Sequence, residues 1–318
     1  MTTTVTALRL LSAALIVLTQ IPFNGTVMAT DRTAIHRSQS ESNPAELSLM
    51  PVPESLKLGD GRLAVTPQFK VAITGQPDLR LEQYVRRAIR RLQDRTAFRI
   101  DGGIGSDSTG AALVIEAQAA APATPSLDTD ESYSLEVSST QAVIKAATSV
   151  GAMRASETFL QLLTSDHSGY YIPVVSIQDK PRFRWRGLLI DVGRHFEPVG
   201  VIKRNLDAMA AVKLNVFHWH LTDDQGFRSE SRKYPELTRE GSDGLFYTQD
   251  EMRDVINYAA DRGIRVIPEF DMPGHLTSLV VSHPELASGP GPYSIERNAG
   301  IFYPALDPAN DKVYKFLD

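Results

Sequence analysis

The chain has 318 residues, of which 42% are hydrophobic and 22% charged, the balance of a globular protein with a packed core. Its 38 acidic and 33 basic side chains give a formal net charge of −5. A dedicated nucleic-acid-binding protein carries a strong basic surplus, so we expect no nucleic-acid partner. The count of cysteines is 0, which excludes disulfides, zinc–thiolate sites, iron–sulfur clusters and cysteine nucleophiles.

The N-terminus has the pattern of a secretory signal. Arg9 precedes an apolar run over residues 10–18, which is shorter than the roughly 20 residues needed to cross a bilayer. The small residues around Ala29 suit cleavage by a signal peptidase. We therefore predict a signal peptide over 1–29, a flexible leader over 30–50 and a secreted or periplasmic protein without a membrane span after cleavage. A buried N-terminal helix is the alternative.

Residues 51–180 read as a small α+β domain. Strands are predicted over 69–74, 111–116, 133–137 and 142–147, and helices over 79–94 and 151–163. The first of these helices has one apolar face and one face rich in arginine. We interpret the arginines as a solvated surface, with binding of an anionic ligand as the alternative.

After Pro181 the pattern becomes strand, helix, strand, helix, strand, with short connections. Apolar strands are predicted over 187–192, 214–220 and 264–270, with helices opening at Pro198 and at a capping box that begins at Thr248. A final helix is predicted over 309–317. This alternation is typical of a parallel α/β sheet.

Polar side chains gather where these three strands end. They are Asp191 and Arg194, then His218, His220, Asp223 and Asp224, and finally Glu269, Asp271 and His275. The carboxyl ends of parallel strands meet at one edge of a sheet, where α/β barrels build their active sites. The sequence therefore predicts one shared site.

Two kinds of chemistry suit these residues. Charged groups with aromatic neighbours at Phe196, Trp219 and Phe227 suit a polyhydroxylated ligand such as a sugar. His218 and His220 alternate on one strand face and suit a divalent metal, so a metal-dependent amidohydrolase stays open as an alternative. That histidine pattern is expected on the first strand of such a barrel, whereas here a βα unit precedes it.

Three segments, Arg184–Phe196, Lys213–Phe227 and Ile267–His275, together resemble family 20 of the glycoside hydrolases, the β-N-acetylhexosaminidases. The resemblance runs from about residue 181 to 318, and the segment 51–180 resembles the α+β domain that precedes the catalytic barrel in that family. It implies a (β/α)8 TIM barrel, of which the chain supplies about the first three βα units.

The resemblance also implies an activity without a cofactor or metal. Family members remove terminal N-acetylglucosamine or N-acetylgalactosamine from the non-reducing ends of oligosaccharides and glycoconjugates by a retaining, substrate-assisted mechanism. By position, Arg194 resembles the arginine that binds the sugar hydroxyls. Asp223 and His275 resemble the catalytic supporting pair that orients the glutamic acid and tunes its pKa.

One part of the family pattern is missing. The family's catalytic Asp-Glu pair ends the fourth barrel strand, and residues 181–318 are far fewer than the roughly 250 of a whole barrel. The pairs Asp130-Glu131 and Asp250-Glu251 lie in the small domain and at a helix start. We therefore expect a fragment of a hexosaminidase that is inactive alone; a non-catalytic, sugar-binding remnant is the alternative.

Overall fold

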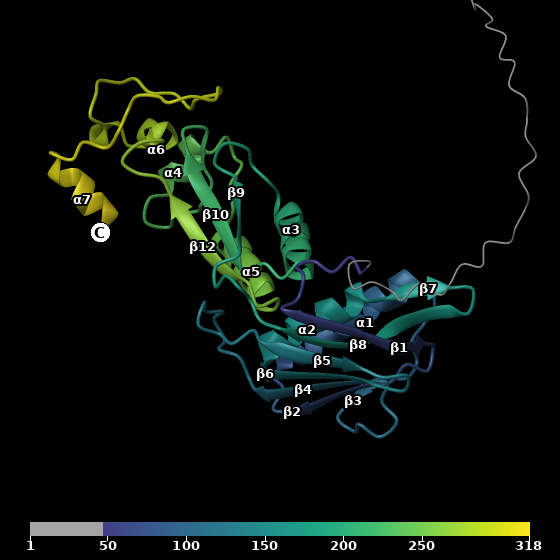
Figure 1. The fold of residues 1–318 in the computed structure, drawn as a ribbon. Coiled ribbons are helices and arrows are strands. Elements are labelled where there is room, and N and C mark those ends of the chain that lie inside the picture. Colours follow the sequence, from purple (N-terminus) through teal and green to yellow (C-terminus); the bar gives the residue numbers. More distant parts are fainter. Residues whose placement is uncertain (1–46) are drawn as a thin grey trace, which may run out of the picture. The chain divides into compact units, whose positions relative to one another are not determined.

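The first part of the chain forms a mixed sheet of eight strands (Figure 1). The computed structural model describes residues 47–318, so the predicted signal peptide and the predicted leader up to residue 46 lie outside the described residues. The strands are β1 (Ser55–Val65), β2 (Val71–Gly75), β3 (Ile104–Gly105), β4 (Leu113–Ala119), β5 (Tyr133–Val137), β6 (Ala142–Thr148), β7 (Thr164–Asp166) and β8 (Gly169–Asp179).

The strands follow the order β1-β8-β5-β6-β4-β2-β3, with β7 paired to β8. The pairs β2–β4 and β4–β6 are parallel, whereas β5 pairs antiparallel with β6 and β8. The predictions for β2, β4, β5 and β6 are confirmed. The long strands β1 and β8 were not predicted. β1 lies at the sheet edge with most of its side chains exposed, so it has little of the hydrophobic alternation that marks a half-buried strand.

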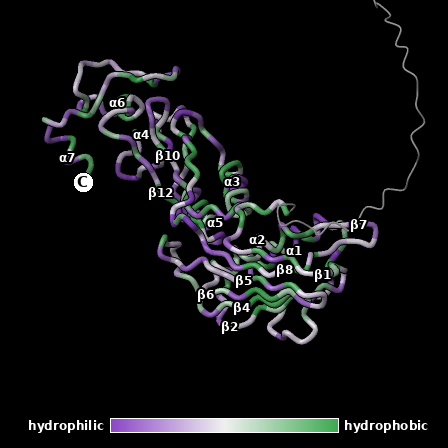
Figure 2. The backbone as a smooth tube through the Cα atoms, in the orientation of Figure 1, coloured by the Kyte–Doolittle hydropathy of each residue, from purple (hydrophilic) through white to green (hydrophobic). Residues whose placement is uncertain are grey.

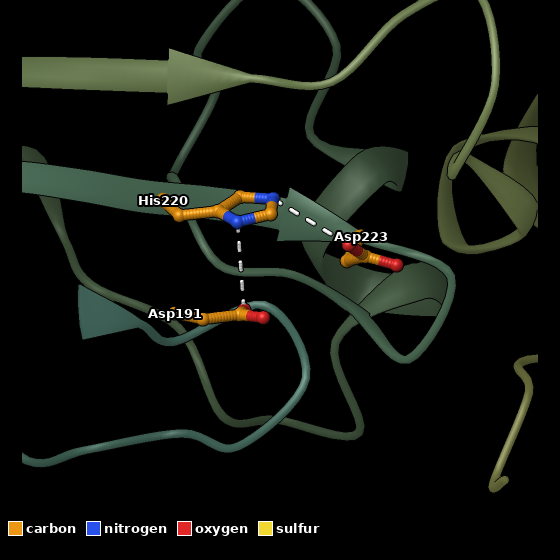
Figure 3. A group of neighbouring side chains, drawn as sticks. All are labelled: Asp191, His220 and Asp223. Atoms are coloured by element: carbon orange, nitrogen blue, oxygen red, sulfur yellow. Dashed lines mark ion pairs between the residues drawn. The ribbon is translucent and has the colours of Figure 1, made fainter. Parts of the chain in front are cut away.

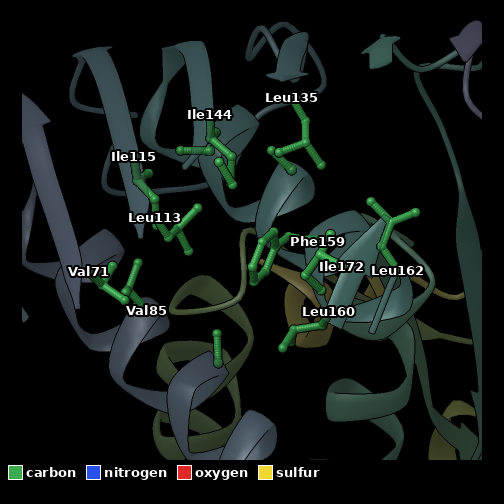
Figure 4. Close-up of a cluster of buried hydrophobic side chains, with 14 of the residues drawn as sticks. Val71, Val85, Leu113, Ile115, Leu135, Ile144, Phe159, Leu160, Leu162 and Ile172 are labelled. Carbon is green, nitrogen blue, oxygen red and sulfur yellow. The ribbon is translucent and has the colours of Figure 1, made fainter. Parts of the chain in front are cut away.

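Two helices, α1 (Leu79–Thr96) and α2 (Ser149–Gln161), lie on the same side of this sheet (Figure 1), and both predicted helices are confirmed. The Asp78 side chain caps α1 by accepting from the Leu81 amide, and Thr148 caps α2 in the same way. Leu113, Ile144, Phe159 and other apolar side chains from the strands and helices form the core (Figure 4). Figure 2 shows the matching hydrophobic stretches in the sheet.

The second part of the chain contains three parallel strands, β9 (Gly187–Asp191), β10 (Val216–Asp223) and β12 (Arg265–Phe270), with β10 in the middle. α3 (Val199–Ala211) and α5 (Gln249–Ala260) connect them. The remaining elements are β11 (Gly226–Phe227), α4 (Glu236–Gly241), α6 (Thr277–Ser282), a 3₁₀ helix (Pro284–Leu286) and α7 (Asp311–Leu317). This is the α/β arrangement of a partial barrel, as predicted.

The two faces of this short sheet differ. Phe217 and Trp219 of β10 are buried in a cluster with α3 and α5, which cover one face. On the other face of the sheet, the side chain of Leu189 on β9 is 49% exposed. Successive strand residues point to opposite faces, so the open face carries the alternate positions, including His218 and His220.

A buried ionic cluster joins the small domain to the strands of the barrel portion. Arg154 of α2 donates to Glu131 and to the backbone carbonyls of Arg262 and Gly263, just before β12. Glu131 also accepts from Arg186, which precedes β9. The small domain thereby fixes the amino ends of two barrel strands. No helix among residues 47–318 is both long and apolar enough to span a membrane.

We expect Arg154→Ala to lower the free energy of unfolding by about 3 kcal/mol or more, because it leaves Glu131 buried with one of its two arginine partners removed. Urea titration followed by circular dichroism measures the change. The matched control is Arg253→Ala, which removes an exposed pair with Asp250 and costs less than about 1 kcal/mol. Equal losses in the two variants would show that the buried cluster does not hold the domains together.

Candidate active site

The site begins with a row of three side chains across the parallel strands. Strand pairing places His220 beside Asp191 on one neighbour and beside Glu269 on the other. Residues at one level of neighbouring strands point to the same face, so all three lie on the open face of the sheet. Figure 3 shows His220 between Asp191 and Asp223. The predicted convergence of strand ends is thus present in the fold.

The two histidines of β10 have different partners. His218 Nε2 lies 2.5 Å from a carboxylate oxygen of Glu269. His220 is buried, and its Nε2 lies 2.8 Å from the Thr222 carbonyl oxygen and 3.5 Å from a carboxylate oxygen of Asp271. These contacts hold the imidazole ring of His220 in one orientation.

Arg194 bridges two of these carboxylates. Its guanidinium lies 2.6 Å from one oxygen of Asp191 and 2.8 Å from one oxygen of Asp223. The Arg194 amide also donates to Asp191, at 2.9 Å. The side chain is 40% exposed, so it is fixed in direction while part of its surface still faces solvent.

Asp223 is fully buried and ends β10. Burial raises the pKa of its carboxyl group above the ordinary value, although the Asp224 amide and the charges of Arg194 and His275 act in the opposite direction. Burial therefore raises the free energy of the ionised form of Asp223. The Asp224 amide, Arg194 and His275 offset part of that cost.

His275 lies nearer to Asp224 than to the predicted partner Asp223. Its Nδ1 is 3.1 Å from Asp224 and 3.5 Å from Asp223. The other oxygen of Asp224 accepts from the amide and hydroxyl of Thr277. His275 has a φ of 54°, a left-handed conformation that is uncommon outside glycine. Such strain is typical of a side chain that a functional site holds in one direction.

Two further residues shape the site and were not among the predicted ones. Arg228 is buried, and its guanidinium donates to the carbonyls of Val192 and Gly193, so it holds the loop that carries Arg194. Gly193 leaves room for β10, since a Cβ there would lie 2.9 Å from the Asp223 amide nitrogen. Gly193 lies inside the segment Arg184–Phe196, and Arg228 directly follows the segment Lys213–Phe227. This position was the only signal in the sequence that could have identified the two residues.

One expectation about aromatic side chains is wrong. Trp219 is buried between Phe217 and Tyr247 and lies on the helix-covered face of β10. It alternates with His218 and His220, so it points away from the site. Phe227 is also buried, beside Phe270, and Phe196 packs against Tyr247.

Within residues 47–318, three sets of side chains have ligand atoms close enough together to hold a metal ion. These sets are Asp191, His220 and Asp223; His220, Glu269 and Asp271; and Asp223, Asp224 and His275. In the first set the Arg194 guanidinium already provides a cation for both carboxylates. In that set, the guanidinium thus supplies the positive charge that a metal ion would bring.

Parallel strands with such side chains at their carboxyl ends define an enzyme-type α/β site. A family model described as "Glycosyl hydrolase family 20, catalytic domain" matches residues 183–318, and one described as "Glycosyl hydrolase family 20, domain 2" matches residues 46–180. The chain belongs to glycoside hydrolase family 20, as the sequence motifs predicted.

Relatives include a β-hexosaminidase of Vibrio furnissii, 33% identical over 305 residues, which covers 89% of this chain and 48% of the relative. The β-hexosaminidase subunit beta of Mus musculus is 46% identical over 197 residues, covering 61% of this chain and 36% of the relative. The chain thus spans about half or less of the length of these relatives.

Solved structures show the same fold. A chitobiase of Flavobacterium johnsoniae superposes with a TM-score of 0.83 at 47% identity, covering 86% of this chain and 42% of that one. An exo-β-N-acetylglucosaminidase of Vibrio harveyi in complex with N-acetylglucosamine has a TM-score of 0.68 at 30% identity, with coverage of 85% and 43%.

We expect Asp223→Asn to stabilise the folded chain at neutral pH. Because burial raises the pKa of Asp223, stability falls as the pH rises from the ordinary aspartate value of 3.8 through the higher folded value. The variant lacks this titration, so its advantage in free energy of unfolding grows across that window and is smallest below it. Urea titrations at several pH values test this, with exposed Asp250→Asn as the control that shows no such dependence. A pH-independent difference between Asp223→Asn and the parent chain would contradict the assignment.

Proposed function

We propose that this site is part of a β-N-acetylhexosaminidase. Such an enzyme hydrolyses terminal, non-reducing N-acetylglucosamine or N-acetylgalactosamine residues of oligosaccharides and glycoconjugates. The observation that carries the proposal is Arg194, which is 40% exposed and held by Asp191 and Asp223 at the strand ends that also carry His220 and Glu269. Membership of family 20 supports the same reaction class.

Arg194 is proposed to bind the hydroxyl groups of the sugar. Two carboxylates hold its guanidinium, and this fixed planar donor can form directed hydrogen bonds to neighbouring hydroxyl oxygens. Because Asp191 and Asp223 already hold the side chain, little conformational entropy is lost when the sugar binds.

His275 is proposed to position and tune the general acid, through the carboxylates of Asp223 and Asp224. A charged or hydrogen-bonded neighbour shifts the proton affinity of a carboxylic acid. In the retaining, substrate-assisted mechanism, the 2-acetamido oxygen of the substrate attacks the anomeric carbon while the acid protonates the leaving oxygen. Asp223 and His275 are thus positioning residues for that acid.

The acid itself is proposed to come from sequence beyond Asp318. The two Asp-Glu pairs of this chain have structural roles. Glu131 is buried between Arg154 and Arg186, and Glu251 completes the capping box of α5. Neither lies at the site. The family match also weighs against the metal-dependent amidohydrolase alternative.

The deciding experiment is to sequence the coding DNA past the codon for Asp318. The chain that ends at Asp318 and the extended chain are then both expressed. We expect the chain that ends at Asp318 to show no hydrolysis of an aryl N-acetyl-β-glucosaminide. An extended chain that continues into a strand ending in Gly-Asp-Glu should be active. Turnover by the shorter chain would contradict the assigned acid, and inactivity of the extended chain would favour the sugar-binding remnant.

In the extended enzyme, Arg194→Ala should lower kcat/KM by about 100-fold, since charge-assisted hydrogen bonds contribute roughly 1.5–3 kcal/mol each. Arg253→Ala, an exposed arginine on α5 with an ion pair three residues away, is the matched control and should leave kcat/KM unchanged. A loss of less than twofold in Arg194→Ala would remove this arginine from the substrate site.

We also propose that the protein is secreted or periplasmic, with residues 1–29 as a cleaved signal peptide. Support comes from the apolar run over residues 10–18 and the small residues that precede Thr30. N-terminal sequencing of protein from periplasm or medium should begin near Thr30. An intact Met1 on the purified protein would contradict the signal peptide.

A further inference from the structure

A cavity of about 640 Å³ lies at the end of the barrel strands opposite to the proposed active site. Its walls come from α1 of the small domain and from α3 and α5 of the barrel portion. Arg262 follows α5 and stands just before β12, so the cavity is near the amino ends of the strands. The groups of the proposed active site lie at the carboxyl ends.

The cavity collects the arginines of one helix face. Arg87, Arg90 and Arg91 of α1 line it together with Arg262. Residues spaced by three and four positions share a helix face, which brings Arg87 and Arg91 to the same wall. This is the arginine-rich face of the sequence, which the proposed hexosaminidase site does not use.

Two of the four arginines have carboxylate partners inside the cavity wall. Arg91 lies 2.5 Å from Glu157, and Arg262 lies 2.6 Å from Asp207. Tyr258 stacks under the Arg262 guanidinium at 3.4 Å and donates its hydroxyl to the second oxygen of Asp207. These contacts fix the charged groups of the wall in place.

The other two arginines have no carboxylate partner among residues 47–318. Arg87 donates to the Asp261 carbonyl at 2.7 Å, and Arg90 is exposed. Burial lowers the pKa of the Arg87 guanidinium, and the charge of Arg262 lowers it further. The charges of Asp261 and Asp207 act in the opposite direction and compensate part of this effect. Asp94 also lines the wall but is exposed, where water screens its charge.

Glu157 supports the wall of the cavity. The side chain is fully buried, and its Oε1 accepts from Tyr84 and Arg91. Because Glu157 has no exposed surface, it fixes Arg91 in the wall and does not itself contact an occupant of the cavity.

We propose that this cavity binds a small phosphate ester. The phosphate group lies between Arg87, Arg90 and Arg262, where guanidinium groups match phosphate oxygens in pairs. The volume of about 640 Å³ is in the range of small-molecule sites, roughly 300–1,000 Å³, and leaves room for an organic group beside the phosphate.

Equilibrium dialysis of the 318-residue chain against radiolabelled glucose 6-phosphate, inorganic phosphate and glucose tests the proposal. We expect glucose 6-phosphate to bind more tightly than inorganic phosphate, and glucose not to be retained. Arg87→Gln and Arg90→Gln should each weaken glucose 6-phosphate binding about tenfold, the effect of losing one charge-assisted hydrogen bond. Because the Arg90 side chain is exposed, its variant separates binding from folding.

Arg86→Gln is the matched control, because Arg86 is an exposed arginine on the same helix that does not line the cavity. It should change the affinity by less than about twofold, as expected for a remote, screened charge. Equal losses in Arg86→Gln and Arg90→Gln, or no retention of glucose 6-phosphate, would overturn the proposal. Equal affinity for inorganic phosphate and glucose 6-phosphate would overturn the assignment to a phosphate ester.

Discussion

Several carboxylates share one small edge of the parallel sheet, and the Arg194 guanidinium is the charge that makes their proximity tolerable. It contacts both Asp191 and Asp223, the second of which is fully buried. Like charges at such distances repel strongly in a protein interior. The position of Arg194 in turn depends on Gly193, which leaves space beside β10, and on Arg228, which holds the carbonyl of Gly193. The arrangement of the carboxylates thus depends on Arg194, and Arg194 depends on Gly193 and Arg228.

The opposite end of the same strands is built for stability. Arg154 reaches from the small domain to the carbonyls that precede β12, and Arg186, which shares Glu131 with it, precedes β9. In α/β barrels the amino ends of the strands commonly serve stability and the carboxyl ends serve chemistry. Here the small domain takes part in that division, since it anchors the strands whose far ends carry the site.

The buried acids of the two regions differ in their surroundings. For Glu131, two arginines outweigh burial, so its pKa is lowered and the carboxylate stays ionised. For Asp223, burial outweighs its neighbours and its pKa is raised. In a structural ion pair, both groups must stay ionised. A group that supports proton transfer benefits from a proton affinity nearer to that of its partner.

The sequence by itself determined the fold class, the order of the βα units and the gathering of polar residues at the strand ends. Hydrophobic periodicity and capping patterns are local, and the capping box at Thr248 appears in the structure as the motif predicts. Three long motifs also determined the family.

Only the tertiary structure decided which residues touch. Strand register placed His220 between Asp191 and Glu269, turned Trp219 to the opposite face, and brought Asp224 nearer to His275 than Asp223 is. The same holds for Glu131, whose arginine partners lie far from it in sequence. Such pairings are long-range, and no local pattern encodes them, because they follow from how strands and helices pack together.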